Sequence, residues 1–408
     1  MSETAEAEIA IVGGGPAGAA LATRLALAGR EVVLFERVPA TRWRASGVFT
    51  SPATRRALLE LGLDAATVTA LCRPIRALTV EAPNGAHTRL DYEEHGGAVG
   101  LDRVRFEEAL LSRARAAGAD VRMGTPVRDV ALPSRRGEPV SLRLAGTAEG
   151  GRLRARVVAG ADGPRSLVAR SAGSRGSAWL MRRAGVTVHR ADPDAPPEGA
   201  PAEARMVLGP GWYCGIAPVP GGRVNVGIVL DARVLSRRVR GGGDAADVES
   251  DVVAGMPPAA DGRRERWRES PRTDEVRFAV PLAHRARRLA GDGFLLVGDA
   301  TGFLDPISGE GIHRALVSAE LAADALVAHD RAAALSAYER RLRAVFRGKD
   351  VVSWTLQAFL SRPQLLAYAL RRLERRTSVR RTFTLVMADL APPGRALDPR
   401  FLAGVLAP

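Results

Sequence analysis

The feature that most constrains the fold is a short apolar run that leads directly into a glycine-rich turn. Residues 9–12 (Ile-Ala-Ile-Val) have the composition of a buried strand, and Gly13, Gly15 and Gly18 follow with the spacing G-x-G-x-x-G. In such a turn the first glycine permits a tight bend, the second lets the backbone approach a diphosphate, and the third lets a helix pack on the strand. A helix that starts at Pro16 would direct unpaired N–H groups toward that anion. The pattern therefore predicts a unit that binds a dinucleotide.

The residues that follow support the same unit. An Ala- and Leu-rich stretch over residues 19–28 predicts the helix, and residues 32–35 (Val-Val-Leu-Phe) predict a second buried strand. That strand leads into Glu36, 23 residues after Gly13. An acid at this place is suited to the ribose hydroxyls of the nucleotide. A glycine-rich turn without a ligand is the alternative, and the order of the elements argues against it.

The bulk composition is that of a globular enzyme. The chain has 408 residues, of which 46% are hydrophobic and 25% charged, so it can hold two domains and an appendage. The formal net charge is +14, but the basic residues are dispersed arginines, with Lys349 the only lysine. No nucleic-acid-binding motif accompanies them, so we attribute the charge to a GC-rich coding bias and expect no nucleic-acid partner.

Targeting and metal-binding signals are missing from the sequence. No uncharged apolar run reaches about 18 residues, and the first apolar stretch is the predicted strand, so we expect a cytoplasmic protein. Cys72 and Cys214 form no metal-ligand pattern, which suits a reducing compartment and predicts no metal site. Cys214 is interpreted as a small core residue.

The middle of the chain predicts a second structural unit. Asn84 and Gly85 form a turn signal between strands over residues 77–82 and 87–92. Between residues 176 and 275, alternating runs predict an antiparallel sheet, and residues 233–268 are expected to be a loop or a weak helical excursion. Further predictions are helices over residues 51–61, 100–118 and 331–390, a helix from Gly311, strands over residues 119–130, 139–145, 152–160, 205–208, 213–218, 224–230 and 293–297, and a wrapping tail over residues 392–408.

Two later motifs identify the cofactor. Residues 160–166 (GADGPRS) follow a predicted strand, and residues 298–312 (GDATGFLDPISGEGI) follow another. With the first turn, they resemble the single-Rossmann FAD enzymes of the p-hydroxybenzoate hydroxylase fold over about residues 5–330. The segment Gly309-Glu310-Gly311-Ile312 most resembles the geranylgeranyl reductase branch.

The resemblance implies an α/β fold with a discontinuous architecture. We expect a single Rossmann-type FAD-binding domain, an inserted antiparallel-sheet substrate domain and a C-terminal helical region. The FAD-binding domain would comprise residues 1–75, 98–175 and 276–330, the substrate domain residues 76–97 and 176–275, and the C-terminal region and tail residues 331–408.

The resemblance also implies roles for particular residues. Asp299 would hydrogen-bond the ribityl chain, Asp162 would lie near the diphosphate, and Arg103 would reach FAD from its helix. A turn acid is the alternative for each aspartate, and a solvated helix face for Arg103. A helix that opens at residues 309–312 would also direct its positive end at the flavin N1/C2=O edge. The expected non-covalent FAD site comprises Gly13, Gly15, Pro16, Ala17, Gly18, Glu36, Arg37, Arg44, Arg103, Val127, Asp162, Gly163, Gly298, Asp299, Pro306, Gly309, Gly311 and Ile312. Since no second G-x-G-x-x-G turn is present, NAD(P)H would dock transiently as reductant.

The reaction depends on what meets the reduced flavin. Halogenases of this fold rely on a lysine, and Lys349 lies outside the matching core, so we do not expect halogenation. Two features favour C=C reduction, namely residues 309–312 and the loosely matching strand over residues 212–218. Against it, Gly215 and Ala217 replace large side chains of that strand, and residues 44–47 lack the cysteine that many prenyl reductases carry.

These smaller side chains suggest a pocket for a ring system. The sequence thus favours an FAD-dependent, NAD(P)H-using monooxygenase that hydroxylates a phenolic or polyketide-like small molecule in bacterial specialised metabolism. The alternatives are a geranylgeranyl reductase-like enzyme that saturates isolated C=C bonds, and a redox-silent FAD protein that catalyses isomerisation or cyclisation. Catalytic candidates are Tyr213, Asn225, His313 and Arg44. We expect a monomer or homodimer whose C-terminal helices pack as a subdomain, with membrane-surface binding as the alternative.

Overall fold

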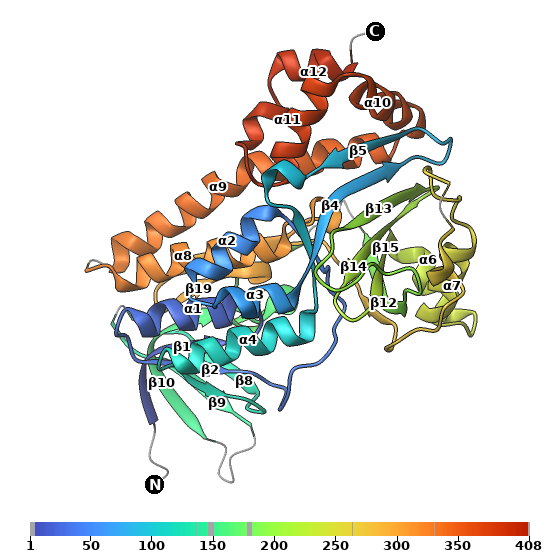
Figure 1. Cartoon of the computed structure of the whole chain (residues 1–408). Coiled ribbons are helices and arrows are strands. Elements are labelled where there is room, and N and C mark those ends of the chain that lie inside the picture. Colours follow the sequence, from blue (N-terminus) through green and yellow to red (C-terminus); the bar gives the residue numbers. More distant parts are fainter. Residues whose placement is uncertain are drawn as a thin grey trace.

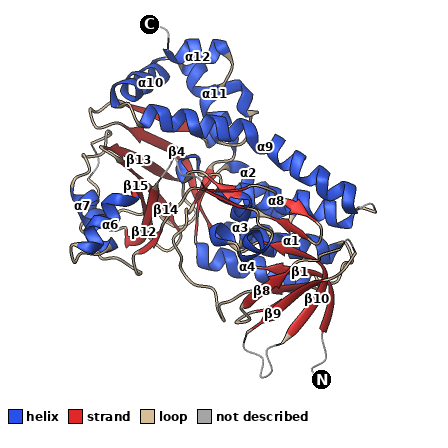
Figure 2. Cartoon of the chain, turned by 180° about the vertical axis from the view of Figure 1, so that it is seen from behind, coloured by secondary structure: helices blue, strands red, loops and turns tan. Residues whose placement is uncertain are grey.

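The computed structural model describes residues 5–135, 137–145, 151–177, 182–262, 264–329 and 331–406. Figures 1 and 2 show a sheet with flanking helices near the N-terminus, a second sheet beside it, and C-terminal helices that lie over the place where the two units meet. Parts of the expected domains over residues 1–4, 178–181 and 407–408 lie outside the described residues.

The first sheet has a core of five parallel strands. These are β1 (Ala5–Val12), β2 (Val32–Phe35), β7 (Asp120–Arg122), β10 (Arg152–Gly160) and β19 (Phe294–Leu296). Antiparallel neighbours extend it, namely β8 (Val127–Ala131), β9 (Val140–Leu144) and β18 (Ala290–Gly291). All four residues of β2 are buried, as expected for a parallel strand covered on both faces.

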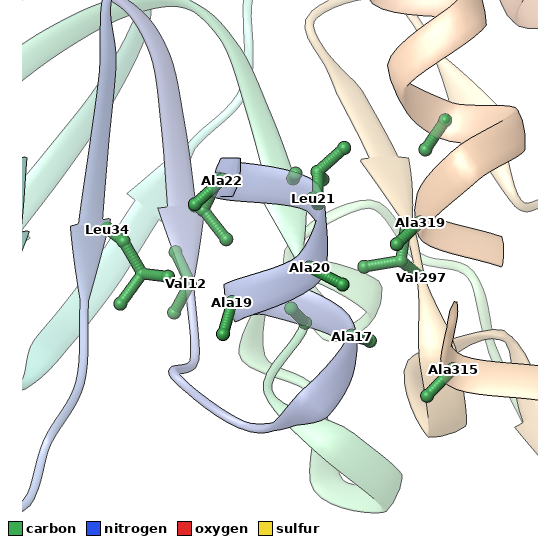
Figure 3. Close-up of a cluster of buried hydrophobic side chains, with 14 of the residues drawn as sticks. Val12, Ala17, Ala19, Ala20, Leu21, Ala22, Leu34, Val297, Ala315 and Ala319 are labelled. Carbon is green, nitrogen blue, oxygen red and sulfur yellow. The ribbon is translucent and has the colours of Figure 1, made fainter. Parts of the chain in front are cut away.

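Small side chains bring the first helix close to its neighbours. Helix α1 (Pro16–Leu27) lies between the sheet and α8 (Gly311–Val327), with α4 (Arg103–Ala116) also against it. Figure 3 shows Ala17 and Ala20 of α1 toward Val297 and Ala319. Because these alanines carry only a methyl group, α1 and α8 can approach closely and hold the turns at their N-termini in place. Helices α2 (Pro52–Glu60), α3 (Ala65–Leu71) and α5 (Leu167–Ser171) complete this unit.

The second sheet has nine strands and two different faces. Its order is β16-β12-β15-β14-β13-β4-β6-β3, with β5 beside β4. The bounds are β3 (Phe49–Thr50), β4 (Cys72–Glu81), β5 (His87–Asp91), β6 (Ala98–Leu101), β12 (Arg183–Ala191), β13 (Ala202–Gly209), β14 (Trp212–Val219), β15 (Arg223–Asp231) and β16 (Arg277–Ala279). The short strands β11 (Arg175–Ser177), β17 (His284–Ala286) and β20 (Gly302–Phe303) form a third sheet.

Two helices cover the outer face of the second sheet, where the sequence predicted less regular structure. Residues 233–268, expected as a loop or a weak helical excursion, contain α6 (Ala232–Arg240) and α7 (Ala245–Ala254). A capping box between Asp244 and Asp247 starts α7, and its buried side chains pack on the face that carries Cys214. Helix α6 is polar on its exposed face, and its Leu235 packs against the sheet, which stabilises the helix.

The C-terminal region is largely helical up to Leu406, the last described residue. Its helices are α9 (Arg331–Leu360), α10 (Pro363–Arg375), α11 (Thr377–Met387) and α12 (Pro399–Leu406). The tail, expected as a wrapping segment, contains α12, whose Val405 packs against Leu373. Helix α9 contacts both units, because Tyr338 is buried in the first core and Phe359 packs in the second. Within the described ranges, no helix has the length and apolar character needed to cross a bilayer.

Candidate active site

The three sequence motifs meet at one edge of the first sheet. Strands β1, β10 and β19 are parallel neighbours, and their register places Val12 beside Gly160 and Gly160 beside Leu296. Each motif begins within two residues of these positions. The carboxyl ends of adjacent parallel strands are where open α/β sheets bind ligands. The fold thus brings together segments that are far apart in the sequence.

Two glycines permit close approaches between the motifs. Gly13 has φ +107°, and an added Cβ would lie 2.5 Å from the carbonyl oxygen of Ala161. Gly298 has φ +57°, and its added Cβ would lie 2.7 Å from the Cβ of Ala17. Any larger residue would push the motifs apart, so glycine is required at both places.

Gly15 is different, because the space in front of it is open. It has φ −70° and ψ −178° and forms the N-cap of α1, and an added Cβ would meet no atom within 4 Å. Unpaired N–H groups of the first helical turn lie beside this space. The arrangement fits a diphosphate at the N-terminus of α1.

Glu36, the residue expected at the nucleoside, follows β2 at the same edge of the sheet. Its carboxylate is buried and accepts hydrogen bonds from Gly14 N (2.7 Å) and Val38 N (3.2 Å). Arg44 approaches the same carboxylate at 3.4 Å, while the neighbouring Arg37 is exposed. The backbone N–H of Thr125 donates to the Glu36 carbonyl, which brings the start of β8 at Val127 alongside.

Two partly buried aspartates follow the other strands. Asp162 Oδ2 accepts a hydrogen bond from Leu167 N (2.6 Å), and Oδ1 is buried without a partner among the described residues. Asp299 lies partly buried in the turn after β19, and His284 donates to its backbone carbonyl. Burial raises the pKa of both carboxyls. The charges of His284, Arg314 and Arg103 oppose this rise at Asp299.

Arg103 therefore lies within electrostatic range of Asp299. Its guanidinium donates to the Gly47 carbonyl (2.9 Å) and pairs with Glu107 (2.8 Å). Its Nε is buried and has no partner in the described part of the chain. Buried polar atoms are normally satisfied. An orphan acceptor on Asp162 and an orphan donor on Arg103 thus fit a polar cofactor at this edge, and with the open space at Gly15 they fit FAD.

The loop before α8 connects the first unit to the second sheet. Pro306 opens a short 3-10 turn, and Gly309 adopts φ +66°, where a Cβ would lie 2.8 Å from the ring of Phe49. Asp305 accepts hydrogen bonds from Ile307 N (3.0 Å) and from the hydroxyl of Tyr213 on β14. Burial raises the pKa of both Tyr213 and Asp305. The pair ties the sheet to the loop that leads into Gly311 and Ile312.

The position of Lys349 differs from the expectation that it lies outside the matching core. Helix α9 brings it to the loop before α8, where its Nζ lies 3.7 Å from the Glu310 carboxylate and 2.6 Å from that of Asp389. Glu310 is the N-cap residue of α8, and Arg314 lies 3.5 Å from its carboxylate. The C-terminal region therefore supplies buried charge directly beside the start of α8.

The second sheet presents an inner face, defined here by Tyr213, Gly215, Ala217, Asn225 and Gly227. These residues alternate with the outward-facing Cys214 and Ile216, and the register pairs Gly215 with Gly227 and Ala217 with Asn225. A Cβ added at Gly215 would meet nothing nearer than the Gly227 carbonyl oxygen at 4.0 Å, so the space above the centre is open. Apolar side chains surround the inner face, namely Trp43, Phe49, Val80, Ala204, Met206, Leu208, Val229, Ile307, Leu356 and Phe359.

The four catalytic candidates from the sequence do not converge. Tyr213 is tied to Asp305, and Arg44 lies at the nucleoside end beside Glu36. Asn225 donates to the hydroxyl of Thr187 (3.0 Å), and His313 lies in the first turn of α8. Sequence reasoning missed His189, Asp274 and His284. Their partners are distant in the sequence, so no local motif marks them.

Comparison with known proteins agrees with this geometry. The family described as "FAD binding domain" matches residues 6–354. Digeranylgeranylglycerophospholipid reductase 2 of Methanopyrus kandleri is 29% identical over 360 residues, covering 84% of this chain and 83% of that protein. Menaquinone reductase of Mycobacterium tuberculosis is 29% identical over 346 residues, covering 81% and 79%.

Two solved structures share the fold. The geranylgeranyl bacteriochlorophyll reductase-like protein of Thermoplasma acidophilum superposes with a TM-score of 0.76 at 20% identity, covering 99% of this chain and 97% of that one. The flavin-dependent halogenase CmlS superposes with a TM-score of 0.72 at 26% identity, covering 85% of this chain and 63% of that one.

Proposed function

This chain belongs to the FAD binding domain family, and from that premise we propose that it is a reductase that saturates a carbon–carbon double bond in an apolar, isoprenoid-like molecule. FAD is the cofactor, and NAD(P)H is the proposed electron source. The sequence contains a single G-x-G-x-x-G turn, so the nicotinamide would dock transiently. This proposal takes the alternative to the hydroxylation that the sequence favoured.

The observation that carries the proposal is the character of the inner sheet face. The open space at Gly215 is surrounded by apolar side chains from both units and from α9. Tyr213, whose hydroxyl would suit a phenol, already donates to Asp305. Apolar surroundings of this kind favour a hydrocarbon chain over a polar aromatic ring. The names of the relatives, which include reductases of an isoprenoid phospholipid and of menaquinone, support the same substrate class.

Each part of the candidate site would have its own role in this reaction. Bound FAD would supply hydride transfer from the nicotinamide to the substrate. Gly15 and the N-terminus of α1 would bind the diphosphate, Glu36 the ribose, and Asp162, Arg103 and Asp299 the chain toward the flavin ring. The N-terminus of α8 would stabilise negative charge at the ring edge. The apolar residues around the inner face would exclude water.

Hydroxylation of a ring compound is the second candidate. Gly215 and Ala217 leave room on β14 where larger side chains would stand, and a flat ring could occupy that space. The two candidates differ in their need for oxygen, since only hydroxylation consumes it.

Anaerobic reoxidation of the flavin tests the proposal. The holoprotein is reduced with dithionite under argon and mixed with a detergent-dispersed geranylgeranyl phospholipid while the flavin absorbance is recorded. We expect the oxidised spectrum to return without oxygen, and we expect the variant Gly215→Phe, which fills the open space, to retain FAD and lose this reaction. Flavin that stays reduced with the lipid and reoxidises only in air would contradict the proposal.

A further inference from the structure

We propose that His189, oriented by Asp274, is the proton donor of the substrate site. The inference rests on the proposed function, because saturation of a double bond needs a proton source, and it is carried by the position and hydrogen bonding of the His189 ring.

His189 lies on the inner sheet face. It belongs to β12, and the register pairs it with Asn225, which in turn pairs with Ala217 on β14. Directly opposite residues in antiparallel strands project to the same side of a sheet. His189 therefore stands in the same row as Asn225 and Ala217, next to the row that holds Gly227 and Gly215. Among the described residues, His189 is the only histidine on this face, and it lies one row away from the open space at Gly215.

Asp274 fixes the ring in one orientation. Its Oδ2 lies 2.5 Å from His189 Nδ1, and its Oδ1 accepts a hydrogen bond from the His189 backbone N–H at 2.9 Å. The backbone N–H of Thr273 donates to the His189 carbonyl at 2.9 Å, which holds the Asp274 segment against β12. A carboxylate at Nδ1 accepts a hydrogen bond from the proton on that nitrogen and so fixes the orientation of the ring. Nε2 is then the atom that can exchange a proton.

Nε2 has no partner in the described part of the chain. The residue is only 4% exposed, so water at the surface does not satisfy this nitrogen. Buried side-chain nitrogens are normally hydrogen-bonded. The ring nitrogen of Trp43, Nε1, is also buried without a partner in the described ranges. The centroid of the Trp43 ring lies 4.3 Å from that of the His189 ring. Two adjacent unsatisfied ring nitrogens point to a missing ligand or ordered water at this place.

Trp43 also shows where this place lies relative to the cofactor. It precedes Arg44, whose guanidinium reaches Glu36 at the nucleoside end of the FAD site. The loop that carries Trp43 thus extends from the FAD-binding unit to the inner sheet face. His189 therefore lies beside a loop that belongs to the FAD-binding unit.

The proposed step balances as follows. The bound cofactor would supply a hydride to one carbon of the double bond, and the other carbon receives the proton of His189 Nε2–H. The π bond breaks, two C–H bonds form, and the two electrons come with the hydride. The imidazole then regains a proton at Nε2 from solvent, while Nδ1 stays hydrogen-bonded to Asp274.

Rate measurements on separate half-reactions test the role. General acid catalysis contributes about 100-fold to 10,000-fold, so His189→Gln should slow reoxidation of the reduced flavin by geranylgeranyl phospholipid by that factor. Asp274→Asn should slow it as well. Reduction of bound FAD by NADPH should be unchanged, and the exposed control His87→Gln should match the wild type in both half-reactions. A His189→Gln variant that reoxidises at the wild-type rate would overturn the inference.

A second measurement needs no turnover. Nitrogen-15 NMR of oxidised holoprotein labelled at histidine reports the protonation of each ring nitrogen. We expect His189, assigned through His189→Gln, to carry protons on both Nδ1 and Nε2 and to shift at Nε2 when geranylgeraniol is added. An unmoved His189 signal would overturn the inference even if the lipid is reduced. A shifted signal in a wild-type enzyme that does not reduce the lipid would place the failure in the proposed function instead.

Discussion

The substitution Gly15→Ala should separate folding from cofactor binding. The backbone at Gly15 has φ −70° and ψ −178°, which alanine adopts freely, and an added Cβ meets no atom within 4 Å. Replacing glycine at such a position stabilises a folded protein by about 0.4–1 kcal/mol, because the unfolded chain loses freedom. The apoprotein should therefore unfold at the wild-type temperature or slightly above it.

FAD binding should respond in the opposite direction. The methyl group would occupy the open space where the diphosphate approaches the N-terminus of α1. A hydrogen bond to a charged group contributes about 1.5–3 kcal/mol, so each one lost weakens affinity by about 10-fold to 150-fold. Gly13→Ala provides the contrast. Its φ of +107° and the backbone of Ala161 at 2.5 Å leave no room for a methyl group, so the folded apoprotein itself should be lost.

Two measurements check this prediction. Circular dichroism gives the unfolding temperature of each apoprotein, and quenching of FAD fluorescence gives the affinity. Gly394→Ala is the matched control, because it also meets no atom within 4 Å and lies in the C-terminal region. A Gly15→Ala protein that binds FAD with wild-type affinity would show that the diphosphate does not lie in front of Gly15.

Three further predictions concern buried charges. Asp299→Ala should give colourless or weakly coloured protein, since this carboxyl is expected to bind the ribityl chain; a visible flavin spectrum of full strength after gel filtration would refute the assignment. Lys349→Met leaves the buried Glu310 and Asp389 without the cation that they share. It should lower the free energy of unfolding by about 3–5 kcal/mol, and Lys349→Arg should recover part of this loss. Urea denaturation that shows no loss of stability in Lys349→Met would contradict the prediction. Burial raises the pKa of Asp305 above 3.8, so above that pH the folded protein binds more protons than the unfolded one, and this carboxyl destabilises the fold as pH rises through its raised pKa. As pH rises from about 4, the free energy of unfolding should therefore fall less in Asp305→Asn than in the wild type, as measured by urea titrations at each pH. Parallel curves of unfolding free energy against pH for the two proteins would refute this reasoning.

The sequence predicted the nucleotide-binding unit well because its signals are local. The turn at residues 13–18, the strand before Glu36 and the start of α8 at Gly311 lie where the motifs placed them. In contrast, α6 was expected only as a loop or a weak helical excursion, and α12 only as part of a wrapping tail. Both are short helices whose stability comes from packing against residues far away in the sequence, such as Leu373 against Val405.

In the candidate site, too, residues in local motifs could be predicted and residues brought together by distant contacts could not. Its glycines and acids belong to motifs and could be named in advance, although their contacts with FAD remain predictions. The pairs that cross between units could not be named. Tyr213 lies 92 residues from Asp305, and His189 lies 85 residues from Asp274. Only the sheet register and the course of the loops bring such side chains together.

The mass of the product tests the central claim most directly. Holoprotein, NADPH and the geranylgeranyl phospholipid are incubated under isotopically labelled oxygen gas, and the lipid is analysed by mass spectrometry. Our account predicts a gain of two hydrogens for each saturated double bond and no label. A product that has gained one labelled oxygen atom would contradict it.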